Sequence, residues 1–201
     1  GTKNSMTERG RFRGMDIDGL QDSAKLPIWD DEETRNTYAL PLHSDAPQHP
    51  SLWQNISPDQ LFTVGPFTCL SSPQSHIGPF KWAIDLLVPD GTPVLAAQDG
   101  VVAEVREDSD RWGNGPEFRD YLNYVTIGHP SGEYTQYCHL AKSSVAASGI
   151  RIGSVVRKGQ QIAVAGKTGW TDRDHLHFVV FREDYVPENP FGFKSLQPRF
   201  E

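Results

Sequence analysis

The sequence predicts an all-β domain, built as a two-layer antiparallel β sandwich or open barrel and preceded by an irregular N-terminal arm. Two observations predict this class. From about Val64 onward, glycine or Asp-Gly turns recur at short intervals, and the segments between them are rich in valine, isoleucine and threonine. Many short strands joined by close turns are typical of sandwiches and barrels. The clearest strand segments are 92–97, 101–105, 124–127 and 161–165, and the turns include Asp90-Gly91, Asp99-Gly100, Ser131-Gly132 and Lys158-Gly159.

Residues 1–60 mix glycine, proline and charged residues without a sustained apolar period of 3.6 residues. We therefore expect an arm that wraps around a domain formed by residues 61–201. Within the arm, residues 38–42 have the pattern of a short strand. Ser57 followed by Pro58 predicts a single helical turn, with Ser57 as its cap and Pro58 at its first position.

Residues 107–120 interrupt the rhythm of the strands. The segment contains Trp112, two glycines, Pro116 and several charged residues, and its apolar residues do not alternate. An irregular insertion of this length in a compact β domain is usually a functional or a disordered loop. We expect it at the rim of the site that the domain carries.

The composition excludes some classes of partner. Lysine and arginine number 19, and aspartate and glutamate number 26, so the formal net charge is −7. An acidic chain without a lysine- or arginine-rich run is a poor ligand for nucleic acid or for an anionic membrane. No apolar run approaches the roughly 20 residues of a membrane span, and no signal-peptide pattern is visible. The oligomeric state stays open.

Cys69 and Cys138 are the only cysteines of the sequence. They lack the Cys-x-x-Cys spacing of redox and zinc-ribbon sites. Either they pair as a disulfide in an oxidising compartment, or they lie apart as two small buried side chains.

Two histidines share one face of a strand predicted within 174–181. Alternation along a strand puts His175 and His177 on one face, and Leu176, Phe178 and Val180 on the other. The apolar face can pack on a core, while the opposite face presents two imidazoles. Imidazole is a frequent zinc ligand, so the pattern indicates either half of a metal site or a solvated polar face.

Asp85 lies in the otherwise apolar segment 82–88. A carboxylate in such a strand costs several kcal/mol unless it is paired or binds a metal. Asp85 therefore either forms an ion pair, with Lys81 or an arginine, or serves as a metal ligand.

A catalytic zinc typically takes three protein ligands and leaves one position for water. Asp85, His177 and one further histidine would supply that number. At the end of another predicted strand, alternation puts Tyr137 and His139 on one face. His139 and His175 would then remain for proton transfer.

Seven motifs, in order along the chain, resemble those of the lysostaphin/LytM-type zinc endopeptidases. They are Asp85 with Gly91-Thr92-Pro93-Val94, then Asp99-Gly100-Val101-Val102, residues 123–129, Tyr137-Cys138-His139-Leu140, residues 155–162, Gly166-Lys167-Thr168-Gly169 and His175-Leu176-His177-Phe178. The resemblance covers about residues 65–182. It implies a two-sheet antiparallel fold, one zinc ion per chain and hydrolysis of peptide bonds in peptidoglycan stem peptides or cross-bridges. It also implies a location in the cell envelope, periplasmic or secreted.

The resemblance also implies roles for individual residues. Asp85 and His177 match zinc ligands, and His139 and His175 match the catalytic pair. Four further residues are candidates to support the site or to line a groove beside it: Tyr137, His129, Asn123 and Lys81. Of these, His129 is favoured as a structural residue, because Gly128 and Pro130 place it at a turn.

The sequence departs from the family pattern at the remaining ligand. The pattern His-x-Gly-x-Asp puts Lys81 at the first ligand position, and a protonated lysine does not bind zinc. The nearest candidate is His76, because a turn at Gly78-Pro79 would return it to the side of Asp85. We therefore predict His76, Asp85 and His177 as the metal ligands.

Three alternatives accompany the prediction of a zinc endopeptidase. Lys81 favours a catalytically inactive LytM-like module that binds the wall or activates an amidase. The glycine turns also suit a lipoyl- or biotin-carrier domain modified at Lys158 or Lys167, but such a carrier gives no role to the histidines. Finally, the N-terminal arm has the position and the length to lie across the groove and hold an inactive state.

Overall fold

The computed structural model describes residues 30–73 and 75–201, so residues 1–29 of the predicted arm lie outside the described part. Strands dominate the described residues, and the helical elements are short: the 3-10 turns η2 (Pro50–Trp53), η3 (Pro58–Gln60), η4 (Gly78–Phe80) and η5 (Pro116–Tyr121), and the helical turn α3 (Ser144–Ala147). The predicted all-β class is confirmed. None of the helices in these residues is long and apolar enough to cross a membrane.

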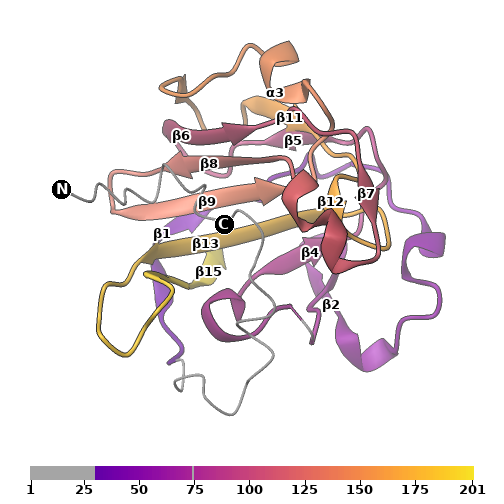
Figure 1. Ribbon diagram of the computed structural model, residues 1–201, viewed down its shortest axis with the longest axis horizontal. Helices are drawn as coiled ribbons and strands as arrows, with labels where there is room; N and C mark the ends of the chain where they lie inside the picture. Colours follow the sequence, from indigo (N-terminus) through magenta and orange to yellow (C-terminus); the bar gives the residue numbers. More distant parts are fainter. Residues whose placement is uncertain (1–29, 74) are drawn as a thin grey trace.

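The largest sheet in the described part of the chain is antiparallel and has nine strands. Its order is β10-β6-β8-β9-β13-β4-β3-β2, and β14 pairs with β13 outside this path. Figure 1 shows β6, β8, β9 and β13 side by side in its centre. The strands are β2 (Leu61–Val64), β3 (Phe67–Leu70), β4 (Ile84–Leu86), β6 (Gly100–Arg106), β8 (Tyr124–Gly128), β9 (Glu133–Cys138), β10 (Val155–Val156), β13 (Leu176–Glu183) and β14 (Phe193–Ser195).

Within residues 30–73 and 75–201, three further pairs of strands accompany the large sheet. β5 (Pro93–Leu95) and β11 (Gln161–Val164) are antiparallel. β1 (Glu33–Tyr38) with β15 (Gln197–Phe200), and β7 (Trp112–Gly113) with β12 (Gly169–Trp170), are parallel, which differs from the prediction of antiparallel strands only. Each parallel pair joins segments far apart in the chain, so no tight hairpin turn imposes the antiparallel direction.

The main core lies on one face of the large sheet. It combines Val125 of β8, Tyr137 of β9 and Phe178 of β13 with Val94 of β5 and Ile162 of β11. The hairpin between β8 and β9 turns at Gly132, whose φ of +81° is accessible to glycine without steric cost. The alternation predicted for residues 176–180 is therefore confirmed, because Leu176, Phe178 and Val180 all belong to this core.

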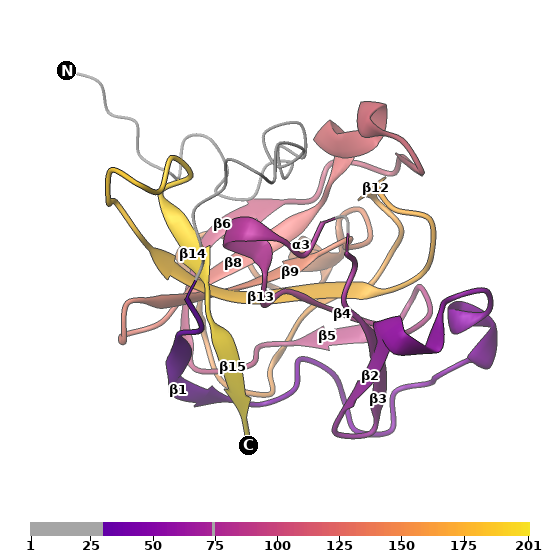
Figure 2. The same ribbon diagram turned by 90° about the horizontal axis from the view of Figure 1, so that it is seen from below.

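Residues 30–60 join the domain through buried contacts. The strand predicted at 38–42 lies instead at Glu33–Tyr38 and pairs with β15, as Figure 2 shows. It ends before Pro41, which has no N–H group for a strand ladder. Tyr38 and Leu42 belong to the main core. The turn predicted at Ser57-Pro58 is confirmed as η3, whereas the domain boundary at residue 60 stays a prediction.

Candidate metal centre

Asp85 and His177 face each other from neighbouring strands. β4 and β13 are antiparallel, and their register puts His177 directly opposite Asp85. Cross-strand partners point to the same side of a sheet, and here the Nδ1 atom of His177 lies 2.9 Å from Oδ1 of Asp85. The alternation that buries Leu176 and Phe178 in the core thus turns His177 to the opposite face.

His76 reaches the same carboxylate from the loop before η4. Its backbone N–H donates to the carbonyl of Ser72 over 2.8 Å, and the N–H of Ser72 lies 3.3 Å from Nδ1 of His76. These two contacts direct the ring inward, where Nε2 lies 3.3 Å from Oδ1 of Asp85. The predicted turn at Gly78-Pro79 follows, with a φ of +58° at Gly78.

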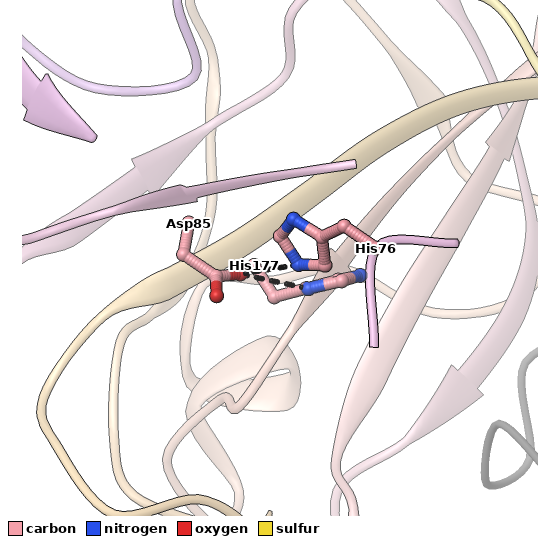
Figure 3. Close-up of side chains that lie close together, drawn as sticks. All are labelled: His76, Asp85 and His177. Atoms are coloured by element: carbon pink, nitrogen blue, oxygen red, sulfur yellow. Dashed lines mark hydrogen bonds and ion pairs between the residues drawn. The ribbon is translucent and has the colours of Figure 1, made fainter. Parts of the chain in front are cut away.

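His76, Asp85 and His177 together form a donor set for a metal ion. One ligand atom from each lies within 4.8 Å of the other two, and all three residues are buried. Figure 3 shows both rings directed at the Asp85 carboxylate. Nε2 of His76 and Nε2 of His177 are buried without a hydrogen-bond partner. Buried polar atoms are normally satisfied, so the orphaned nitrogen of His76 beside Asp85 fits a bound cation, and two histidines with one carboxylate fit zinc.

The electrostatics of this donor set favour a charged carboxylate. Burial alone would raise the pKa of Asp85, but the charges of His76 and His175 and the hydrogen bond from His177 outweigh it and hold the pKa well below its usual value. Burial lowers the pKa of His177 despite the opposing effect of Asp85. A deprotonated aspartate and a neutral imidazole are the forms that bind metals.

His139 and His175 lie beside the donor set, with ring centroids 4.5 Å apart. The His139 ring is 6.2 Å from the His177 ring, and Nε2 of His175 lies 3.6 Å from Oδ1 of Asp85. His139 follows the last residue of β9 and has a φ of +64°, a left-handed conformation that few residues other than glycine adopt. This conformation ends the strand alternation and brings His139 to the face of His177.

Two backbone carbonyls set the orientation of the histidine pair. Nδ1 of His139 lies 2.6 Å from the carbonyl oxygen of Thr168, and Nδ1 of His175 lies 3.0 Å from that of Arg173. A carbonyl only accepts, so Nδ1 carries the hydrogen in both rings and Nε2 of each neutral ring has a free lone pair. Burial, together with the charges of His175 and His177, lowers the pKa of His139 to about 3.

Asn123 supports the site from behind. Its side chain donates to the carbonyls of Ser109 and Leu140, over 2.8 and 3.1 Å, and accepts from the N–H of Ser109. Its own N–H donates to Oγ1 of Thr168 over 3.2 Å. Asn123 thus ties the start of the predicted loop 107–120 to the residue whose carbonyl orients His139.

Tyr137 does not line a groove. It belongs to the main core, opposite Phe178 in the β9–β13 register, and its hydroxyl accepts from the N–H of Ala97. The prediction that Tyr137 and His139 share a face is wrong, because strand alternation stops at the left-handed residue His139. Cys138, opposite His177, takes the site side of β9 instead.

His129 and Lys81 lie away from the donor set. Both ring nitrogens of His129 have partners: the carbonyl of Asp99 at 2.7 Å and Oγ1 of Thr135 at 3.0 Å. His129 therefore has a structural role. Lys81 pairs with Asp31 and not with Asp85, so the alternative of a Lys81–Asp85 ion pair is wrong.

Cys69 and Cys138 are both buried and free, and burial raises the pKa of each thiol.

Sequence reasoning missed the two carbonyls that orient the histidines. Thr168 was visible only as part of the turn motif Gly166-Lys167-Thr168-Gly169, and Arg173 carried no signal at all. A backbone carbonyl is common to every residue, so its use in a site leaves no mark in the sequence. The position of both residues next to the two histidines in space follows only from the fold.

An all-β domain that gathers a buried His–Asp–His donor set beside two oriented histidines is typical of metal-dependent hydrolases. Residues 79–190 match peptidase family M23, and the chain belongs to this family. The resemblance inferred from the motifs is confirmed. The matched range contains Asp85, His139, His175 and His177 but begins after His76.

Known relatives are similar over about half of the chain. An uncharacterized metalloprotease of Haemophilus influenzae is 37% identical over 103 residues, which are 51% of this chain and 18% of the relative. The peptidoglycan DD-endopeptidase ShyB of Vibrio cholerae is 38% identical over 97 residues, 48% of this chain and 19% of the relative. The chain therefore spans about a fifth of the length of these two relatives. Among solved structures, a catalytic-domain variant of the prophage-encoded M23 protein EnpA from Enterococcus faecalis is 24% identical, with a TM-score of 0.45, covering 68% of this chain and 92% of that one.

Proposed function

We infer that this chain is a zinc-dependent endopeptidase that hydrolyses peptide bonds in the stem peptides or cross-bridges of peptidoglycan. One observation carries the proposal: His76, Asp85 and His177 converge on one point, directly beside the oriented pair His139 and His175. A structural metal site has no use for two further histidines with free Nε2 lone pairs, whereas hydrolysis needs groups that transfer protons.

His76, Asp85 and His177 would hold one zinc ion per chain. When bound, zinc polarises a peptide carbonyl and lowers the pKa of water from 15.7 to about 7. The burial of all three ligands keeps bulk water away from their donor atoms, which strengthens their electrostatic interaction with a cation. His76 takes the place of the ligand that the family pattern puts at Lys81, and the ion pair of Lys81 with Asp31 explains how this lysine is accommodated.

The histidine pair would handle the protons of the reaction. The carbonyls of Thr168 and Arg173 keep Nδ1 of each ring protonated, so Nε2 of His139 or His175 accepts the proton of the attacking water. The other ring, when protonated, donates its Nε2–H to the oxyanion that develops on the peptide carbonyl. Both rings are buried, so neither needs to reorganise a shell of water.

The substrate class is proposed from the relatives. The similar protein of Vibrio cholerae is named a peptidoglycan DD-endopeptidase, and we extend that substrate class to this chain. A net charge of −7 is consistent with a peptide substrate and unfavourable for nucleic acid. An enzyme with this substrate acts in the cell envelope, either in the periplasm or after secretion.

Zinc content and cleavage, measured together, test the proposal. The unaltered protein should hold about one zinc per chain by elemental analysis and should release new amino termini from purified peptidoglycan. His76→Ala should lose both properties, and His49→Ala, which removes an exposed histidine, should keep both. Zinc retained by His76→Ala would show that His76 is not the third ligand. If the zinc-loaded protein binds peptidoglycan but does not cleave it, the alternative function, an inactive wall-binding module, would be favoured over the endopeptidase.

A further inference from the structure

The segment 167–174, between β11 and β13, carries both carbonyls that orient the histidine pair. Thr168 lies next to its first residue, Lys167, and Arg173 lies next to its last, Asp174. The carbonyl of Thr168 accepts from His139, and the carbonyl of Arg173 accepts from His175. The geometry of the pair therefore depends on how each end of this segment is held.

The Thr168 end is held by the backbone and by buried groups. Oγ1 of Thr168 donates to the carbonyl of Leu140 over 2.9 Å and accepts from the N–H of Asn123 over 3.2 Å. The next residue, Gly169, donates its N–H to the carbonyl of Arg111 over 2.9 Å, directly beside the β7–β12 pair. A change of one side chain elsewhere in the segment leaves these bonds in place.

The Arg173 end is held by two side chains. Oγ1 of Thr171 donates to the carbonyl of Arg173 over 2.9 Å, and the side chain of Asp174 fastens the next residue. Oδ2 of Asp174 accepts from the N–H of Asp90 over 3.0 Å, and Oδ1 accepts from Nζ of Lys167 over 2.5 Å. Nζ of Lys167 also contacts Oδ2 of Asp90. Asp90 itself lies in a fixed turn, because the N–H of Gly91 donates to the carbonyl of Ala165 over 2.8 Å. The ion pair Lys167–Asp174 thus joins the two ends of the segment and fastens them to this turn.

This ion pair is better placed than a typical surface pair. The side chains of Lys167 and Asp174 are only 21% and 22% exposed, so water screens them less than it screens exposed charges. The ammonium group of Lys167 lies 5.3 Å from the centre of the Trp112 ring, which covers it on one side. The predicted loop 107–120 therefore contributes Trp112 to the support of the site.

We propose that Lys167 and Asp174 are positioning residues for His175: their ion pair holds the Arg173 carbonyl where it fixes the Nδ1–H tautomer and the orientation of the His175 ring. The inference rests on the proposed peptidase function for its kinetic consequence, but the tautomer itself is a property of the folded protein. His139 is the internal reference, because its carbonyl partner at Thr168 is held independently of the pair.

The experiment compares variants of the zinc-loaded full chain by long-range ¹H–¹⁵N spectra of the histidine rings and by steady-state kinetics on peptidoglycan peptides. Lys167→Met removes the cation, and Asp174→Asn removes the anion while its side-chain oxygen can still accept from the N–H of Asp90. Lys167→Arg restores the charge. Lys158→Met is the matched control, since it breaks an ion pair with Glu201 at the surface. The side chains of Lys158 and Glu201 are 40% and 42% exposed.

The expected result is selective. In Lys167→Met and Asp174→Asn the His175 ring should lose its single Nδ1–H tautomer while His139 keeps its own, and kcat should fall about 10-fold or more with little change in KM. Lys167→Arg should recover much of kcat, and Lys158→Met should match the unaltered protein. Unchanged His175 signals and kcat in both charge-removing variants would overturn the proposal, and so would loss of zinc from both. An unaltered protein that cleaves no peptide would refute the proposed function, while the His175 spectra would still decide the positioning role.

Discussion

Two buried clusters of the same sheet combine a carboxylate with histidine or tyrosine, and they differ in how completely their polar atoms are satisfied. In the first, Glu133 accepts from the N–H groups of Arg35 and Asn36, over 2.7 and 3.1 Å, and from the hydroxyl of Tyr38 over 3.0 Å. His129 packs edge-on against Tyr38, and both of its ring nitrogens have partners.

In the second cluster, the polar atoms converge but only some of them are satisfied: His177 is hydrogen-bonded to Asp85, while two ring nitrogens have no partner. Asp85 faces the rings of His76 and His177, and the outer Nε2 of His177 and the inward Nε2 of His76 have no hydrogen-bond partner. A cluster that is complete in itself stabilises the fold, whereas a buried cluster with orphaned donors indicates a missing ligand. The contrast teaches that burial of charge alone does not mark a functional site; unsatisfied ligand atoms do.

The largest effect that this comparison predicts is the loss of metal from the second cluster only. Asp85→Ala should reduce zinc content from about one per chain to near zero and lower peptide hydrolysis by more than about 10⁴-fold, because the carboxylate ligand is gone. Glu133→Gln should keep its zinc. Elemental analysis and a cleavage assay on the two variants measure this difference, and zinc loss from Glu133→Gln would contradict it.

The part of the site that the sequence predicted depends on regular alternation. The register of β4 and β13 put Asp85 opposite His177 on the face away from Leu176, as the apolar pattern indicated. The prediction from alternation that Tyr137 and His139 share a face failed, because the left-handed backbone of His139 ends the strand. Histidine is not a residue type that predicts this conformation.

Other features were beyond prediction because they join segments far apart in the chain. In the sequence, nothing distinguishes Glu133 from other acids at strand ends. Its hydrogen-bond donors lie on β1, about a hundred residues earlier in the chain, so they become visible only in the fold. The same holds for the parallel pairing of β1 with β15. The position of His76 was within reach, because Gly78-Pro79 marked a turn between it and Asp85.

The next effect separates the ligands from the histidine pair beside them. His139→Ala and His175→Ala should each lower kcat by about 10²- to 10⁴-fold, the usual contribution of a group that transfers a proton. Both variants should keep about one zinc per chain, because neither residue belongs to the donor set. A variant with the same turnover as the unaltered protein would show that its histidine does not take part in the mechanism. A variant that loses zinc would show that its histidine is a metal ligand.

A smaller effect is expected in the satisfied cluster, and it concerns stability alone. Tyr38→Phe removes one of the donors to Glu133 and should lower the free energy of unfolding by about 1–3 kcal/mol, because the buried carboxyl group loses a hydrogen-bond donor. The specific activity per folded molecule should not change. Urea titration measures the loss, with Glu188→Gln, an exposed acid, as the matched control. An activity loss larger than the loss of folded protein would show that the two clusters are coupled.

The smallest effect is a dependence of stability on pH that belongs to His129. Burial lowers the pKa of His129 below its ordinary value of 6.5. Below about pH 6.5 the unfolded chain therefore binds a proton that the folded His129 does not. This residue's contribution makes folding less favourable as the pH falls, by at most about 1.4 kcal/mol per pH unit, and it adds nothing above that range.

His129→Gln should be less stable at pH 7.5, since Asp99 and Thr135 lose a partner, but should lose less stability between pH 7.5 and 5.5 than the unaltered chain. Urea titrations of the chelator-treated proteins at both values measure this, with the exposed His49→Gln as control. Equal pH slopes for the unaltered chain and His129→Gln would mean that His129 takes up its proton in the folded state as readily as in the unfolded one, and the satisfied cluster would then be open to water.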